Sequence, residues 1–148
     1  MNALGRSRGG FGTKAVVACE GGGRAVAFAL LPGQGSELRV AGRLLSRVAE
    51  LGAVGRVVCD RGYSSAAWRS EIRARGCEPV VPAQPTHPVV AYDRAAYRRR
   101  NRVERLWGRL KEWRAVATRY EKTATSFMGV LYLAAMMDWI KHILSHTT

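Results

Sequence analysis

Acidic residues are scarce in this sequence. Aspartate and glutamate total 11 in 148 residues, against 24 lysines and arginines, and the formal net charge at pH 7 is +13. Such a charge favours a polyanionic partner. Nucleic acid fits better than an anionic membrane, because the cations gather in a helix-like segment with tryptophan and glutamate and do not form a polybasic tail beside a lipid anchor. We therefore expect a nucleic-acid partner and no membrane.

Paired cysteines, a leader and a long apolar run are also missing. Cys19, Cys59 and Cys77 have no C-x-x-C spacing and lie in or beside apolar strand-like runs, which is typical of reduced core thiols in a cytosolic protein. The first 12 residues lack the apolar stretch of a signal peptide. The longest apolar run, 127–137, is too short to span a bilayer and predicts a core helix. These absences favour a cytoplasmic location.

The order of predicted elements indicates one α/β domain. Residues 1–12 form a Gly/Arg-rich loop, and residues 13–148 form the domain, whose length is sufficient for one hydrophobic core. Hydrophobic periodicity and turn residues give the order β-β-α-β-α-β-α-α, with a mixed sheet flanked by helices. The strands are expected at 13–20, 25–31, 54–59 and 77–81, and the helices at 36–51, 64–75, 97–113 and 123–143.

The helix expected at 97–113 combines one acid with many cations. On a helix, four residues fall within an arc of roughly 60°: Tyr97, Arg100, Glu104 and Lys111. An adjacent apolar arc, which includes Trp107 and Trp113, is expected to face the core. A further face carries Arg98, Arg102, Arg105 and Arg109, whose density favours phosphate contact over plain solvated surface. A carboxylate in this setting binds a metal or pairs with an arginine such as Arg100 or Arg105, and the sequence leaves both open.

Asp60 is the second acid of interest. It follows the apolar strand at 54–59, and open α/β sheets display functional side chains at such strand ends. Carboxylates from a strand end and a facing helix, here Asp60 and Glu104, could together hold Mg²⁺. Two such ions, roughly 4 Å apart, would activate a water or 3′-hydroxyl and stabilise the leaving oxygen of a phosphodiester. The alternative is that Asp60 is only a turn residue before glycine. His87, His142 and His146 show no ligand spacing, and Asp93 and Asp138 are expected to be turn and surface residues.

Tyr97, Arg100, Glu104 and Lys111 also match the pattern Y-x-x-R-x-x-x-E-x(6)-K. This pattern is the signature of bacterial insertion-sequence DDE transposases of families four and five, and the chain resembles that group. Three further segments resemble the family-five proteins in the family's order: Gly5-Arg-Ser-Arg-Gly-Gly-Phe-Gly-Thr-Lys14, Cys59-Asp-Arg-Gly-Tyr63 and Leu110-Lys-Glu-Trp-Arg-Ala-Val-Ala-Thr-Arg-Tyr120.

The resemblance implies an RNase H-like catalytic core that cuts element ends and joins them to target DNA using Mg²⁺ or Mn²⁺, with two ions in the complete enzyme. By the same resemblance, Asp60 is the second acid of the triad and Glu104 the third. Arg100 and Lys111 would contact double-stranded DNA near the cleavage site, and Tyr97 would belong to the same stripe. The implied location is the bacterial cytoplasm, in association with the nucleoid.

One departure from the family pattern concerns the first catalytic aspartate. In the family it lies on a first strand upstream of the Gly5–Lys14 segment, and this chain starts four residues before that segment. Asp93 and Asp138 do not lie on an early strand, and Glu20, beside the hairpin turn, is a poor replacement. We therefore expect an N-terminally truncated core that lacks its first strand, either as the downstream frame of a two-frame element or as a decayed copy.

Three functions compete at this point. The first is a transposase catalytic fragment that is inactive alone and active with an upstream transposase fragment. The second is a non-catalytic DNA-binding or regulatory fragment that occupies DNA, or that associates with transposase and inhibits it. The third, a small RNase H-like nuclease acting alone, requires a complete set of carboxylates that the sequence does not show.

Overall fold

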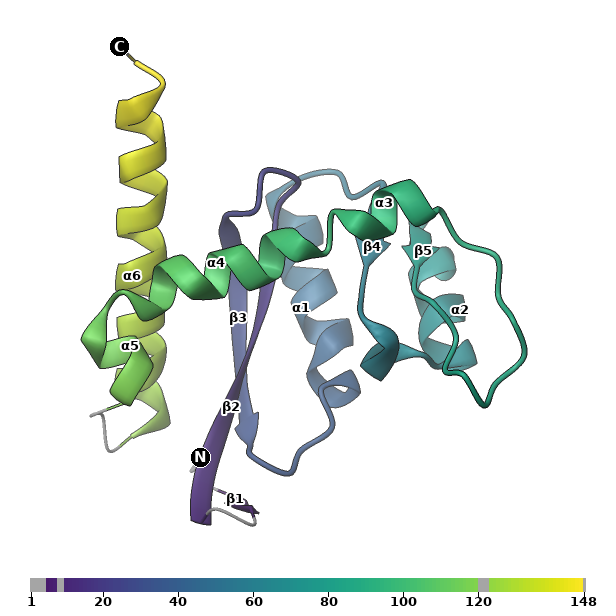
Figure 1. Cartoon of the computed structure of the whole chain (residues 1–148), viewed down its shortest axis with the longest axis horizontal. Helices are drawn as coiled ribbons and strands as arrows, with labels where there is room; N and C mark the ends of the chain where they lie inside the picture. The colour runs from purple at the N-terminus through teal and green to yellow at the C-terminus, as the bar shows by residue number, and fades with distance from the viewer. Residues whose placement is uncertain (1–4, 8–9, 120–122, 148) are drawn as a thin grey trace. The chain divides into compact units, whose positions relative to one another are not determined.

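The computed structural model describes residues 5–7, 10–119 and 123–147, which form two compact units. The first unit combines Met1–Gly35 with Arg102–Thr148, and the second comprises Ser36–Asn101. The α/β class expected from the sequence is confirmed, since both units combine strands with helices (Figure 1). The strands form two small sheets, one antiparallel and one parallel, where the sequence predicted one mixed sheet in one domain.

An antiparallel sheet of three strands, in the order β1-β2-β3, belongs to the first unit. β2 (Gly10–Cys19) pairs with β3 (Ala25–Pro32), so that Val17 faces Phe28, and the predicted hairpin is confirmed. β1 (Gly5–Ser7) pairs with the first residues of β2. The prediction of a loop at 1–12 is therefore wrong for residues 5–7 and 10–12, which form strands. The prediction relied on the lack of apolar side chains, and the backbone hydrogen bonds of a sheet do not need them. Residues 1–4 and 8–9 of that prediction lie outside the described residues.

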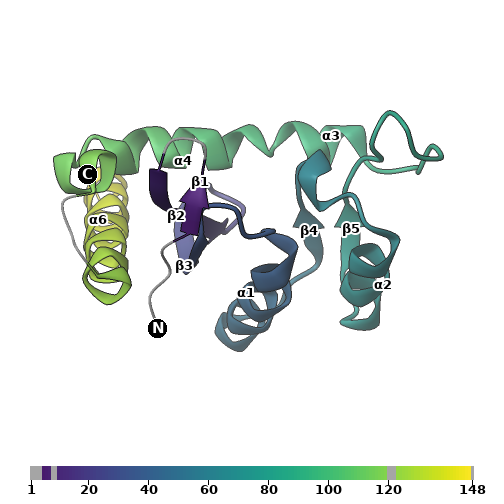
Figure 2. The same ribbon diagram turned by 90° about the horizontal axis from the view of Figure 1, so that it is seen from below.

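Helices cover one face of the β2–β3 hairpin in the first unit. These are α4 (Asn101–Lys111) and α6 (Ala124–Ser145), as Figures 1 and 2 show, and α5 (Arg114–Thr118) packs against α6. Their apolar residues share one core with β3, which comprises Ala25, Phe28, Leu106, Leu110, Val116, Phe127, Leu131, Ala134 and Ala135. Alternate residues of β2, namely Ala15, Val17 and Cys19, pack against it. The period of two in the strand and of about 3.6 in the helices thus brings one apolar side of each element to the same core.

The second unit contains two helices and a parallel pair of strands. α1 (Leu38–Leu51) leads to β4 (Arg56–Val58), and α2 (Ala66–Ala74) then connects β4 to its parallel partner β5 (Glu78–Val80). A short 3-10 turn at Arg61–Tyr63 precedes α2. The core of this unit consists of Ala41, Leu45, Trp68, Ile72, Cys77 and Val81. The unit ends with α3 (Arg94–Arg98), which Asp93 caps by accepting from the backbone N–H of Ala96 at 2.9 Å.

The helix predicted at 97–113 is interrupted twice. α3 ends at Arg98, and α4 begins only at Asn101. The backbone N–H groups of Arg99 and Arg100 donate to carbonyls three residues back, at 3.0 and 2.9 Å, which is a tighter turn than the α-helical one. The helix stops again at Lys111. Trp113 occupies the position just before α5, and 40% of its surface is exposed, so the prediction that Trp113 is a core residue is wrong.

α6 confirms the helix predicted at 123–143. Its 22 residues are long and apolar enough to cross a membrane by length and composition, a property that it shares with many core helices. Phe127 and Leu131 on one side belong to the core of the first unit, as the sequence predicted. A single helix of this kind does not by itself indicate a membrane.

Candidate functional site

Asp60 lies where the sequence predicted it, just after β4. Its backbone is extended, and its Oδ1 accepts a hydrogen bond from the backbone N–H of Gly62 at 2.7 Å, which starts the turn at Arg61–Tyr63. Asp60 therefore is a turn residue, as the simpler interpretation held. The residue is exposed, and Oδ2 takes no part in this turn. A turn of this kind fixes the direction of the carboxylate but uses only one of its oxygens. The role of Asp60 in the turn is therefore compatible with metal binding through the other oxygen.

The turn that carries Asp60 is anchored from three sides. The hydroxyl of Tyr63 donates to Oε2 of Glu37 at the start of α1, at 2.7 Å. The amide of Gln84 donates to the carbonyl of Arg61 at 3.1 Å. The hydroxyl of Ser64 accepts from the backbone N–H of Gln84 at 3.1 Å and from the guanidinium of Arg69 at 3.3 Å. These contacts tie the turn to α1, to α2 and to the segment after β5, so Asp60 stands on a rigid support.

Burial around this turn suppresses ionisation. It raises the pKa of Tyr63 well above its usual range, and the neighbouring Glu37 acts in the same direction. Burial also raises the pKa of the adjacent Cys59 to about 11, although Trp68 lowers it slightly. Both side chains are therefore neutral at neutral pH. Of the side chains in the segment 59–63, Asp60 is the one that can offer a negative charge there.

Tyr97, Arg98 and Arg100 also belong to the second unit. Tyr97 is half-buried on α3, with its ring edge-on to Tyr92 at 5.5 Å between centroids, and the guanidinium of Arg100 lies 6.0 Å from the centre of the Tyr97 ring. Arg98 is exposed. Tyr97 and Arg100 are three residues apart, and the tighter turn at Arg99–Arg100 keeps them close, since the backbone N–H of Arg100 donates to the carbonyl of Tyr97.

Glu104 and Lys111 belong to the first unit, on α4. Both are exposed, and seven residues on a continuous helix return to within about 20° of the same direction. They therefore share one face of α4, as predicted. Glu104 lies in the first turn of α4, where the helix dipole favours an acid, and Lys111 lies in the last turn, where it favours a cation. The stripe predicted on one helix is thus divided: Tyr97 lies on α3 and Arg100 in the break, whereas Glu104 and Lys111 lie on α4.

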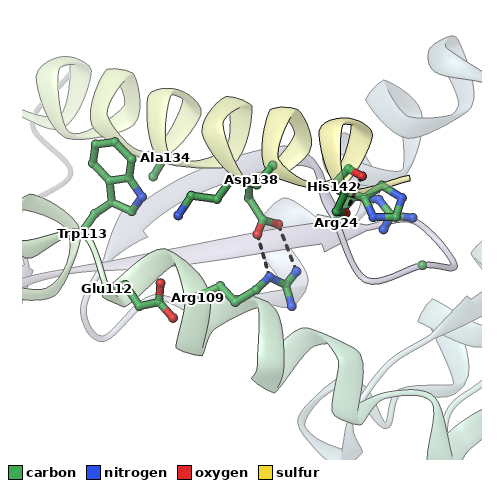
Figure 3. Close-up of a pocket in the computed structure, with 10 residues that line it drawn as sticks. Arg24, Arg109, Glu112, Trp113, Ala134, Asp138 and His142 are labelled. Carbon is green, nitrogen blue, oxygen red and sulfur yellow. Dashed lines mark hydrogen bonds and ion pairs between the residues drawn. The ribbon is translucent and has the colours of Figure 1, made fainter. Parts of the chain in front are cut away.

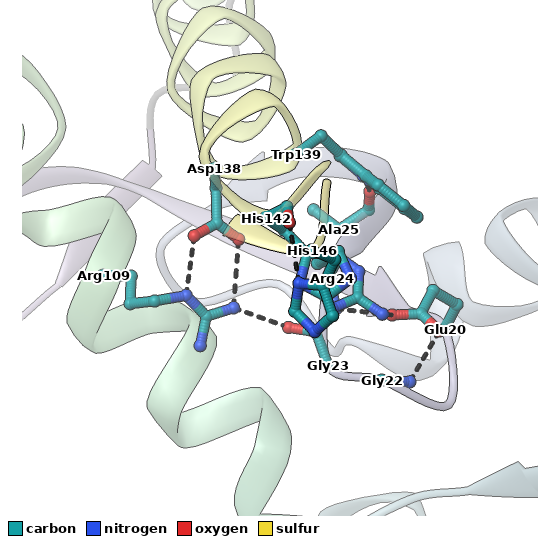
Figure 4. Close-up of polar contacts among 10 residues, drawn as sticks. All are labelled: Glu20, Gly22, Gly23, Arg24, Ala25, Arg109, Asp138, Trp139, His142 and His146. Carbon is teal, nitrogen blue, oxygen red and sulfur yellow. Dashed lines mark hydrogen bonds and ion pairs between the residues drawn. The ribbon is translucent and has the colours of Figure 1, made fainter. Parts of the chain in front are cut away.

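The arginine face predicted on α4 is partly used inside the first unit. The guanidinium of Arg109 donates to both carboxylate oxygens of Asp138 on α6, at 2.7 and 3.0 Å, and to the carbonyl of Gly23 at 2.8 Å (Figure 4). This bidentate bond raises the pKa of Arg109. Arg102 lies against the same turn, because a Cβ on Gly23 would be 3.0 Å from its own. Arg105 is exposed.

Asp138 was expected to be a surface residue, and this expectation is wrong. Its side chain is 14% exposed and holds Arg109 across 29 positions of sequence. The signal available in the sequence was an aspartate alone inside a long apolar helix, which indicates a partner cation without identifying it.

A pocket of about 450 Å³ opens beside this ion pair (Figure 3). α6, the end of α4 and the β2–β3 turn line it, through residues that include Arg24, Glu112, Trp113, Lys141 and His142. Arg24 is already bound, since Glu20 accepts from it at 3.0 Å and its guanidinium lies 5.0 Å from the centre of the Trp139 ring. Cations and acids nearly balance in the lining, so the pocket shows no clear preference for an anion. Sequence reasoning missed this pocket, because its residues are far apart in the chain.

No group of three or more histidine, cysteine, aspartate or glutamate side chains that could hold a metal ion occurs within the described residues. Several acids have cationic or backbone partners. Asp93 caps α3 and pairs with Arg56 at 3.3 Å, and the first of these interactions lowers the pKa of Asp93 most. Glu71 and Glu78 pair with Arg75 and Arg56, at 2.8 and 2.6 Å. Glu20 accepts from the backbone of Gly22 and Arg24 as well as from the Arg24 guanidinium.

Comparison with known proteins adds a separate finding. Residues 57–141 match a family described as the transposase DDE domain. A Brucella ovis protein assigned as the transposase for insertion sequence element IS6501 is 33% identical over 114 residues, which cover 74% of this chain and 84% of that protein. No solved structure matches. The range matched by the family includes Asp60, all of α3 and all of α4.

Proposed function

The chain belongs to the DDE transposases of bacterial insertion sequences, and from that premise we propose that it contributes to phosphodiester hydrolysis and strand transfer at insertion-sequence ends. The family supports DNA transposition in general and a soluble, cytoplasmic protein. The observation that carries the finer proposal is that both acids of the family signature occupy exposed positions on rigid elements, Asp60 after β4 and Glu104 on α4. We further propose an RNase H-like core, because the β2–β3 hairpin, then a helix, a strand, a helix and a strand parallel to the previous one agree with the later part of the order of such a core.

Asp60 and Glu104 are the proposed metal ligands. Carboxylate oxygens are the donors that Mg²⁺ prefers, and Asp60 keeps one oxygen outside its turn. When bound, divalent ions would supply an activated hydroxyl nucleophile and stabilise the leaving oxygen. Each carboxylate has its own support within its unit: the anchored turn carries Asp60, and the core-packed α4 carries Glu104.

The proposed DNA contacts lie around Glu104 in the sequence. Lys111 shares the face of Glu104 on α4 and would hold a phosphate as a point charge. Arg98, Arg100 and Arg105 would add guanidinium contacts to the backbone, and Tyr97 would support Arg100 through its ring. Arg102 and Arg109 were part of the same prediction. The bonds of Arg109 to Asp138 and Gly23 make it the least available of the set.

We propose that this chain does not cleave DNA by itself. A two-metal site needs a further carboxylate, and Asp93 and Asp138 are held by Arg56 and Arg109. The missing ligand would come from an upstream transposase fragment or another copy. The same observation favours a second candidate function, in which the chain is a regulatory fragment that binds DNA without cutting it.

The test uses the purified chain with Mg²⁺ or Mn²⁺ and labelled insertion-sequence ends. We expect binding that weakens steeply with salt and no cleavage products. Replacing Glu104 and Asp60 together by the uncharged isosteres, Glu104→Gln and Asp60→Asn, should reduce Mn²⁺ binding, measured as the Mn²⁺ signal in electron paramagnetic resonance. Glu50→Gln with Glu112→Gln is the matched control, because it removes two exposed acids that have no role in the proposed site.

Three results would count against the proposal. Equal losses of Mn²⁺ binding in the control and in the double variant would remove Asp60 and Glu104 as ligands. Cleavage by the chain alone that disappears in Glu104→Gln would show that its carboxylate set is complete. DNA binding with no salt dependence would contradict the proposal that the basic side chains contact DNA phosphates.

A further inference from the structure

A second group of arginines lies on α1, outside the family signature. Arg39, Arg43 and Arg47 are spaced four residues apart, and all three are exposed. Four residues advance a helix by about 6 Å and turn it by about 40°, so the three guanidinium groups follow one side of α1. The opposite side is fixed, because Val40, Ala41, Leu44 and Leu45 are buried. The direction of the arginine stripe is therefore set by the core of the second unit.

No ion pair or hydrogen bond within the described part of the chain neutralises these three side chains. Like charges four residues apart destabilise a helix by about 0.2–0.5 kcal/mol per pair. The stripe therefore costs stability and receives no compensation inside the second unit. A row of like charges that destabilises its helix and has no partner in the fold indicates a function.

α2 extends the basic surface. The guanidinium of Arg75, at the end of α2, donates to the hydroxyl of Ser46 on α1 at 2.7 Å and to Glu71 at 2.8 Å. This contact fixes the end of α2 beside α1. Glu71 is engaged by Arg75, and Glu50 is the exposed acid on α1 itself. Cations thus outnumber acids on this surface.

We propose that the α1 stripe of Arg39, Arg43 and Arg47 binds the phosphate backbone of duplex DNA without reading its sequence. Evenly spaced guanidinium groups suit a regular row of phosphates, which they bind by charge-assisted hydrogen bonds. A lipid surface fits less well, because Gly42 and Ser46 lie between the arginines on that side and Glu50 follows them, and an interfacial helix needs apolar side chains there. The inference rests on the proposed function, since it assumes that the chain acts on DNA, and it adds a contact surface to it.

The test compares two double variants of the full chain with equal loss of charge. Arg43→Gln with Arg47→Gln removes two residues of the stripe. Arg94→Gln with Arg114→Gln removes two exposed arginines from the starts of α3 and α5. Affinity for a random-sequence duplex is measured by fluorescence anisotropy at several salt concentrations, and thermal melting checks that each variant is folded.

We expect the stripe variant to bind more weakly and its log–log salt dependence to become shallower by about 1–2, since each lost phosphate contact removes about 0.9. The control should keep the slope of the parent chain. An unchanged slope in the stripe variant, or an equal change in both, would overturn the inference. So would a loss of binding to anionic vesicles with DNA binding intact. A parent chain that does not bind DNA would instead refute the proposed function, so the two failures are distinguishable.

Discussion

Arg109 on α4 and Arg43 on α1 have similar settings in the sequence, since each lies on an amphipathic helix among other arginines. Arg109 is bound by Asp138 and the carbonyl of Gly23, so it joins α4 to α6 and to the β2–β3 turn within the first unit. Arg43 is exposed on a stripe that no described carboxylate neutralises. The difference shows that arginine density alone does not identify a DNA-binding face. A guanidinium that has acceptors within the fold, as Arg109 has, contributes to the packing of the unit. A guanidinium without them, as in Arg43, remains available to an external anion.

The largest expected effect in this comparison is on stability, from Arg109→Ala. The variant leaves the mostly buried carboxylate of Asp138 without its donors and should lower the free energy of unfolding by about 2–3 kcal/mol. Arg43→Ala should change it by less than about 0.5 kcal/mol. Urea denaturation followed by tryptophan fluorescence measures both. Equal effects of the two substitutions would remove the distinction between the two arginines.

Gly23→Ala tests the turn that receives Arg109. Gly23 has a φ of +86°, and an added Cβ would lie 3.0 Å from the Cβ of Arg102. We expect a loss of about 1–2 kcal/mol, from the left-handed backbone and the close approach together. Gly21→Ala in the same turn is the control, because no atom lies within 4 Å of its added Cβ. Thermal melting that ranks the two variants in the opposite order would contradict this account.

The smallest expected effect is a pH dependence at His142, beside the same cluster. Desolvation, followed by the charges of Arg24 and His146, lowers the pKa of His142, while Glu20 and Asp138 oppose the shift. With a lowered pKa in the folded state, the unfolded state binds the proton first as the pH falls, so stability should decline below about pH 6.5. Melting curves at pH 5.5 and 7.5 measure this decline. The variant His142→Asn should show less of it, and an unchanged decline would assign it to other groups.

Several parts of the fold were predictable because they depend on short-range patterns. The hairpin of β2 and β3 follows from alternating apolar residues around three glycines, and α2 follows from its Ser65 cap and Gly76 stop. The position of Asp60 follows from the end of β4. The division of the helix at Arg99–Arg100 was not predictable, because nothing in that arginine run breaks a helix locally.

The sequence by itself determined the family, the acids Asp60 and Glu104 as candidates, and a charge that favours a polyanionic partner, since these depend on residue identity and spacing. Only the tertiary structure decided which arginines are engaged. It paired Arg109 with Asp138 and left the α1 stripe exposed. Such pairing joins residues far apart in the chain, and a guanidinium binds whichever acceptor packing brings within reach.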